Sequence, residues 1–278
     1  MTMADIWEVY AVRYAETLTR STRDNFMAWQ DIHDAPMPLD YFVWLLRCGS
    51  RHILVDTGFN EAAAAARKRK LIINPVDALA KFGVAADAIG DVIVTHFHYD
   101  HAGNVDRFPA AKFHVQDREM SYATGRCMCE RVLSAPFAVE GVTQMVRHVY
   151  AGRVCFHDGH DVIAPGIEVH RVGGHSDGLQ IVTAETKRGR LVIAGDAAHF
   201  YVNMQRNNPF PIVVNVADML SGWRLIEKLS DGDLNRVIPG HDPLVSRSFA
   251  PVPAGGVDVF ALHEDPIQPI GVVAGSYS

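Results

Sequence analysis

Short apolar segments separated by polar turns recur through both halves of the chain. Strand-like runs occupy 7–14, 41–47, 52–56, 89–94 and 112–115 in the first half, and 153–156, 167–172, 180–184, 191–194 and 236–238 in the second. Turn signals such as Pro165-Gly166 and Arg188-Gly189 separate neighbouring runs. The pattern predicts two groups of consecutive strands, one in each half.

Helical patterns lie between these strands. Helices are expected over 61–70, from Asn74-Pro75 to Gly83, from Asp117 onward and over 216–229. Residues 124–150 have a looser helical pattern typical of a segment that covers a site, and the tail after 250 is rich in Pro and Gly and is expected to be loosely packed. We therefore expect a single domain over 1–278 of the α/β (α+β) class, a four-layer αββα sandwich.

Composition and charge are those of an ordinary globular protein. Of 278 residues, 48% are hydrophobic and 21% charged, with a net charge of −6, so a sizeable core is expected and nucleic-acid binding is not. The basic run 67–70 is interpreted as the solvated end of a helix, where positive charge suits the helix dipole.

Cysteine usage and the N-terminus favour a cytoplasmic protein. The four cysteines lack the spacing of a disulfide framework and are expected to be reduced. The first residues show no basic stretch followed by an apolar one, and no apolar run approaches the length of a membrane span. We expect neither a membrane nor a nucleic acid as partner, but a small-molecule substrate.

The most informative segment is Thr95-His96-Phe97-His98-Tyr99-Asp100-His101-Ala102-Gly103, directly after an apolar run. Two imidazoles two residues apart can converge on one metal ion, and the Asp-His pair that follows can bind a second ion nearby. Three later strand ends repeat the pattern of an apolar run, a small residue and a ligand-type side chain, at Gly174-His175, Gly195-Asp196 and Gly240-His241. Strands that end on one rim would bring these side chains together.

These motifs, in this order and with Val55-Asp56-Thr57-Gly58 upstream, resemble the metallo-β-lactamase fold superfamily over roughly residues 40–245. The resemblance implies a dinuclear site. His96, His98 and His175 would bind one ion, Asp100, His101 and His241 the other, and Asp196 would bridge both. Asp56 would orient ligands without binding metal.

Imidazoles and carboxylates suit two Zn²⁺ ions, with Fe, Mn or Co as alternatives. Two ions lower the pKa of a shared water toward 7, and the resulting hydroxide can attack a carbonyl carbon. Asp100 or Asp196 could relay the proton. The expected activity is therefore metal-dependent hydrolysis.

Within the superfamily, the chain most resembles quorum-quenching lactonases that open N-acyl-homoserine lactones, and related small-lactone hydrolases. These enzymes usually carry a tyrosine three residues after the bridging aspartate, where this chain has His199. His199 could donate the equivalent hydrogen bond, or Tyr201 could reach the substrate. Met204 and Phe210 are candidate walls of the substrate pocket. The resemblance also admits a homodimer.

Other activities on this fold predict different sequence features. A glyoxalase-II-like thioesterase would use basic residues in its C-terminal region, and residues 250–278 contain no Lys or Arg. A metal-dependent hydrolase of another ester or of an amide is also compatible with the sequence. A non-catalytic binding protein on this fold would have lost ligands, whereas all seven ligand positions are filled here.

Overall fold

Two β-sheets form the centre of the protein in a computed structural model that describes residues 5–28 and 34–271. The first sheet has the strand order β13-β1-β2-β3-β5-β6-β7, with β4 paired to β1. Its strands are β1 (Glu8–Thr17), β2 (Leu39–Cys48), β3 (Arg51–Val55), β4 (Lys70–Leu71), β5 (Asp91–Ile93), β6 (Lys112–Gln116), β7 (Val154–His157) and β13 (Asp258–Ala261).

The second sheet has the order β12-β11-β10-β9-β8 and is antiparallel except for the parallel pair β11 and β12. Its strands are β8 (His160–Ala164), β9 (Ile167–Arg171), β10 (Gln180–Thr186), β11 (Gly189–Gly195) and β12 (Val237–Pro239). The second sheet comes from the second half of the chain, as the hydrophobic pattern predicts. The strand expected at 153–156 is β7, however, and joins the first sheet beside β6.

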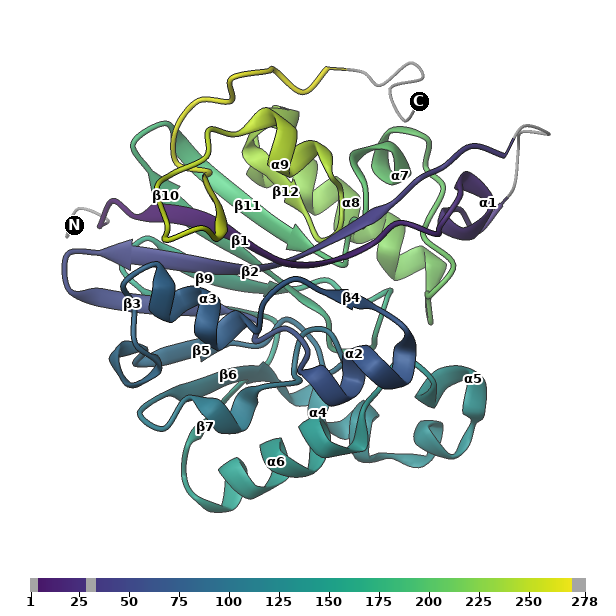
Figure 1. Cartoon of the computed structure of the whole chain (residues 1–278). Coiled ribbons are helices and arrows are strands. Elements are labelled where there is room, and N and C mark those ends of the chain that lie inside the picture. Colours follow the sequence, from purple (N-terminus) through teal and green to yellow (C-terminus); the bar gives the residue numbers. More distant parts are fainter. Residues whose placement is uncertain (1–4, 29–33, 272–278) are drawn as a thin grey trace.

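Helices cover the outer faces of both sheets (Figure 1). The α-helices are α1 (Thr22–Asn25), α2 (Glu61–Arg67), α3 (Pro75–Lys81), α4 (Asp117–Thr124), α5 (Arg131–Ser134), α6 (Val139–Tyr150), α7 (Tyr201–Gln205), α8 (Val216–Leu229) and α9 (Leu244–Ser248). Short 3₁₀ turns are η1 (Ala86–Ala88), η2 (Val105–Arg107), η3 (Arg126–Cys129) and η4 (Leu234–Arg236). The expected αββα sandwich is confirmed.

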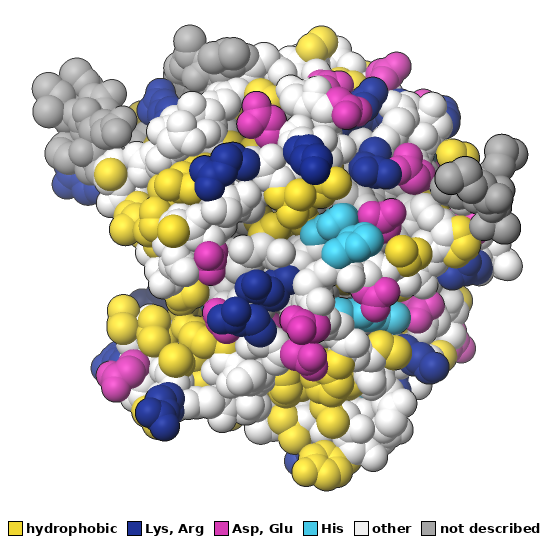
Figure 2. All heavy atoms as spheres, turned by 180° about the vertical axis from the view of Figure 1, so that it is seen from behind, with side chains coloured by type: hydrophobic (Ala, Val, Ile, Leu, Met, Phe, Trp, Pro, Cys, Tyr) yellow, Lys and Arg dark blue, Asp and Glu magenta, His cyan; other side chains and the backbone are white. Residues whose placement is uncertain are grey.

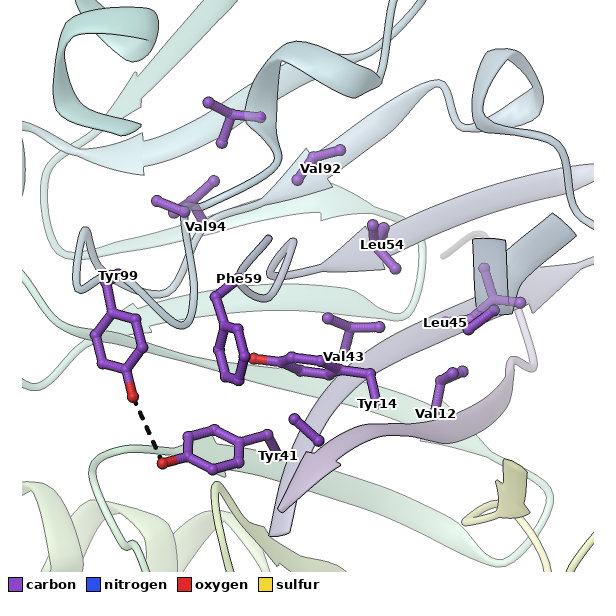
Figure 3. Packing of buried hydrophobic residues seen from close by; sticks show 14 of the residues in the cluster. Val12, Tyr14, Tyr41, Val43, Leu45, Leu54, Phe59, Val92, Val94 and Tyr99 are labelled. Carbon is purple, nitrogen blue, oxygen red and sulfur yellow. Dashed lines mark hydrogen bonds between the residues drawn. The ribbon is translucent and has the colours of Figure 1, made fainter. Parts of the chain in front are cut away.

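Strand alternation divides the apolar residues of β2 between two cores. Phe42, Trp44 and Leu46 face the second sheet, where they join a cluster that includes Ile181 and Ile193. The intervening residues of β2 face the helices with Tyr14, Phe59 and Leu54 (Figure 3). A strand buried on both faces has to be apolar at every position, which explains the unbroken hydrophobic run of β2.

The segment after 250 corrects one expectation. It was expected to be loosely packed, but β13 pairs antiparallel with β1 and extends the first sheet. Val259, Ala261 and Leu262 are almost fully buried, because β13 covers the edge that β1 would otherwise expose. Residues 272–278 of this tail lie outside the described residues.

Charged side chains of both signs are mixed on the face of the molecule that Figure 2 shows. Lys and Arg side chains alternate with Asp and Glu over the face shown in Figure 2, with histidines near its middle. Among the described helices, none has the length and apolar character that crossing a bilayer requires.

Candidate active site

Four strand ends bring the seven predicted ligands to one place. The loop after β5 carries His96, His98, Asp100 and His101, and the segments after β9, β11 and β12 carry one ligand each: His175, Asp196 and His241. All seven side chains belong to residues that are at most 8% exposed. The two halves of the chain therefore contribute to one buried cluster.

Asp196 lies at the centre of this cluster. Its Oδ1 is 3.0 Å from His241 Nε2 and 3.3 Å from His101 Nε2. Its Oδ2 is 3.1 Å from His175 Nε2 and 3.8 Å from His96 Nε2. Each carboxylate oxygen thus faces a different set of imidazoles, which is the arrangement that a bridging ligand requires.

Two groups of donors surround Asp196. The first donor group is His96, His98 and His175, and the second donor group is Asp100, His101 and His241; within each, the donor atoms lie within 4.8 Å of one another. His96 Nε2, His101 Nε2 and Asp196 Oδ1 are buried without a well-formed hydrogen bond to any described residue. Buried polar atoms normally have partners, so these unsatisfied atoms and their chemistry fit divalent metal ions.

Hydrogen bonds behind the ligands fix their rings. Asp56 Oδ2 accepts from His101 Nδ1 at 2.7 Å, and Asp56 also accepts from the backbone and hydroxyl of Thr95. His175 Nδ1 donates to the Ile212 carbonyl at 2.6 Å. Such contacts leave Nε2 free to bind an ion, so Asp56 occupies the orienting position that the sequence predicts.

Glu119, on α4, was missed by the sequence analysis. It is 1% exposed, and its carboxylate accepts from Phe97 N at 2.8 Å, Ser176 Oγ at 2.8 Å and Gly178 N at 3.0 Å. These donors flank the ligands of the first donor group on two separate loops. Glu119 therefore ties the loops together, a role that no local motif signals.

The protonation of the cluster reflects its charges. Burial and neighbouring imidazoles lower the pKa of His96 and His98 well below the usual range. Burial opposes protonation of His101, but Asp196 and Asp56 outweigh it and raise its pKa well above the usual range. Burial likewise opposes ionisation of Asp196, but the surrounding imidazoles hold its pKa well below the usual range.

A cavity of about 360 Å³ opens above the cluster. Its floor contains His98, Asp100, Asp196 and His241, and its walls are mostly apolar, from residues 132–136 and 210–214. A cavity of this size accommodates a small organic molecule.

The family model described as "Metallo-beta-lactamase superfamily" matches residues 37–241. The chain belongs to this superfamily. Its members and structural neighbours include metal-dependent hydrolases, and the enzyme class expected from the sequence is therefore confirmed. No curated protein sequence matches significantly.

Solved structures of superfamily members share the fold at low sequence identity. A structure titled quorum-quenching N-acyl homoserine lactone lactonase has a TM-score of 0.72 and 22% identity, covering 88% of this chain and 95% of that one. AidC, titled a dizinc quorum-quenching lactonase, has a TM-score of 0.69 and 16% identity, covering 93% and 95%. A probable metal-dependent hydrolase from Staphylococcus aureus has a TM-score of 0.68 and 16% identity, covering 97% and 98%.

The predicted substrate residues have different placements. His199 lines the cavity, with Nε2 3.1 Å from Asp196 Oδ2, and stacks on Phe210 at 3.8 Å between ring centroids. Burial lowers the pKa of His199 to about 3, so its ring is neutral. Tyr201 does not line the cavity, because its fully buried ring points into the core and its hydroxyl donates to Val237 O. Met204 packs against the same core, so both substrate assignments are wrong.

The segment 124–150 contributes to the cavity through α5 and the turn after it. Val132, Leu133, Ala135 and Pro136 line the wall, and Arg67 holds this turn by donating to the carbonyls of residues 135 and 137. The basic run assigned to solvent therefore has at least one member facing the site.

Proposed function

We propose that this protein is a dinuclear metal-dependent hydrolase that opens a lactone. The observation that carries the proposal is Asp196, whose two oxygens face separate groups of imidazoles at the floor of an apolar cavity. One carboxylate shared by two donor groups would hold two neighbouring ions. Zn²⁺ suits this donor set, with Fe, Mn or Co as alternatives.

Two bound ions would supply a nucleophile from water at neutral pH and polarise the substrate carbonyl. The chain's own residues would position the reactants and move the proton. Asp100 borders the cavity and would accept a proton from water and return it to the ring oxygen as the acyl–oxygen bond breaks. His199 lines the cavity and would contact the substrate carbonyl through its ring, and the product is the open hydroxy acid.

Lactones are favoured over other esters by the structural neighbours. Several are titled as N-acyl homoserine lactonases, and one holds the product N-hexanoyl-L-homoserine at its catalytic metal centre. The apolar walls at 132–136 and 210–214 would accommodate an acyl or aromatic substituent. We further propose a cytoplasmic enzyme, consistent with four unpaired cysteines, and a homodimer.

The test is hydrolysis of a lactone panel by Zn-loaded enzyme, followed as acid release at neutral pH. The panel holds short- and long-chain acyl-homoserine lactones and aryl-fused lactones, and Asp196→Asn serves as the inactive control. A kcat/KM above about 10⁴ M⁻¹s⁻¹ for one member is expected. No turnover of any lactone by fully metal-loaded enzyme would reject the lactonase proposal and direct the search to thioesters, amides and aryl esters.

A further inference from the structure

Three arginines from two segments border the cavity above the metal ligands. Arg20 follows β1, and Arg67 and Arg69 lie at the end of α2 and just beyond it. All three are partly buried, and among the described residues no carboxylate lies within 4.0 Å of any of their guanidinium nitrogens. The mouth of the cavity therefore concentrates positive charge that the described part of the protein leaves without an ion pair.

Aromatic side chains contact all three arginines, and the Arg67 guanidinium lies 3.9 Å from the centre of the Tyr99 ring. The Arg20 guanidinium lies 4.8 Å from the centre of the Phe210 ring, which stacks on His199. Arg69 Nε donates to the Tyr99 hydroxyl at 3.2 Å, and that hydroxyl lies 3.5 Å from the Tyr41 hydroxyl (Figure 3). Arg20 also donates to Asn25 Oδ1 at 2.7 Å and to the Asp24 carbonyl, and Arg67 donates to two backbone carbonyls. Packing and these neutral acceptors thus hold the guanidinium groups.

Burying the Arg20 guanidinium near a second cation costs free energy. Burial lowers the pKa of Arg20, and the nearby charge of Arg69 lowers it further, although Asp24 opposes both. Burial also acts on Arg69, but Tyr41, Tyr99 and Asp100 outweigh it and raise the pKa of Arg69. Partly desolvated charges normally have partners, and arginine is suited to bind carboxylate or phosphate oxygens in pairs. The carboxylates at the floor cannot fill this role if they hold metal ions.

We propose that Arg20, Arg67 and Arg69 bind an anionic group of the substrate, a carboxylate or a phosphate, at the end remote from the bond that is hydrolysed. This inference rests on the proposed hydrolase function and specifies its substrate class. The Phe210 ring lies between Arg20 and the floor, 4.8 Å from the guanidinium and 3.8 Å from the His199 ring, measured to the ring centres. The anionic group is therefore several bonds away from the reacting carbonyl.

The first experiment compares three lactones that differ only at the end of the acyl chain: N-succinyl-homoserine lactone, its terminal amide and the N-butanoyl compound. We expect the Zn-loaded enzyme to favour the acid over the amide about tenfold in kcat/KM, mainly through KM. An equivalent phosphate-bearing acyl lactone distinguishes the two anionic groups. Equal rates for acid and amide would overturn the proposal while leaving the lactonase function intact.

A binding measurement separates the two proposals when no lactone is turned over. Calorimetry compares the open-ring N-succinyl-homoserine with its terminal amide, because both present the same homoserine carboxylate to the metals. We expect about tenfold tighter binding of the acid. Equal binding would overturn the anionic site independently of catalysis.

Arg69→Gln and Lys68→Gln form a matched pair of variants. Both remove one positive charge from the same run, but Lys68 is exposed and does not border the cavity. Arg69→Gln should reduce the preference for the acid to threefold or less, Arg69→Lys should retain part of it, and Lys68→Gln should keep all of it. A preference that survives Arg69→Gln, or falls equally in Lys68→Gln, would show that general charge and not this site selects the substrate.

Discussion

Gly240→Ala tests the position of the bridging carboxylate most directly. Gly240 precedes His241 and packs against Asp196 so closely that an added Cβ would lie 2.5 Å from Asp196 Oδ1 and 2.9 Å from the Gly195 carbonyl carbon. The backbone of Gly240 cannot easily retreat, because its N–H bonds to the carbonyls of Gly195 and Ala198, each at 3.0 Å. The carboxylate has to move instead.

The required movement can be compared with what a metal site tolerates. Relaxing the contact from 2.5 Å to the roughly 3.3 Å of a close C–H···O approach displaces Oδ1 by about 0.8 Å. Coordination distances in metal sites stay within about 0.2 Å of their ideal values. We therefore expect Gly240→Ala to weaken binding of the ion at the second donor group by at least about 100-fold, and to lower kcat/KM by a similar factor. Overpacking should also destabilise the fold by about 1–3 kcal/mol.

The assay is chelator competition with metal analysis, read beside thermal unfolding. Gly90→Ala is the matched control, because a Cβ there meets nothing within 4 Å. It should bind two ions as tightly as the unaltered protein. If Gly240→Ala does the same and keeps its activity, then Asp196 Oδ1 does not bind the second ion and the bridging arrangement is refuted.

Three further outcomes follow from the site. Glu119→Gln should weaken binding of the ion at the first donor group about 10–100-fold in chelator competition, since it loses the carboxylate that ties two loops, whereas Glu140→Gln on an exposed helix surface should change nothing. Complete removal of metal should lower the melting temperature by about 10 °C in calorimetry, and an unchanged value would argue against structural coupling. His199→Phe should keep the stack on Phe210 but lower kcat/KM about tenfold. Its pH profile between about 5 and 9 should keep its shape, because burial holds the pKa of His199 at about 3; an altered profile would contradict a neutral ring.

The sequence predicts which side chains meet in the buried cluster because their positions are set locally. Each ligand follows an apolar strand and a turn, and strands that end on one rim bring such residues together. Glu119 has no such signal, since its role depends on two loops that approach it only in the fold. The assignment of Tyr201 as a substrate contact is wrong for the opposite reason. Tyr201 is close to the site in sequence, at the start of α7, but packing turns its ring toward β12.

The basic run 67–70 shows how one backbone conformation decides which charged side chains face solvent and which face the cavity. Read as the solvated end of a helix, all four residues of 67–70 would face water. The helix instead ends at Lys68 in the left-handed conformation, with φ of 55°, and the chain turns back so that Lys70 joins β4 beside β1. Arg67 and Arg69 then border the cavity, while Lys68 is exposed and Lys70 pairs with Glu16. The reversal at Lys68 thus brings Arg69 back to the cavity beside Arg67, the last residue of α2, which periodicity alone does not reveal. The proposed selectivity for an anionic substrate depends on that reversal.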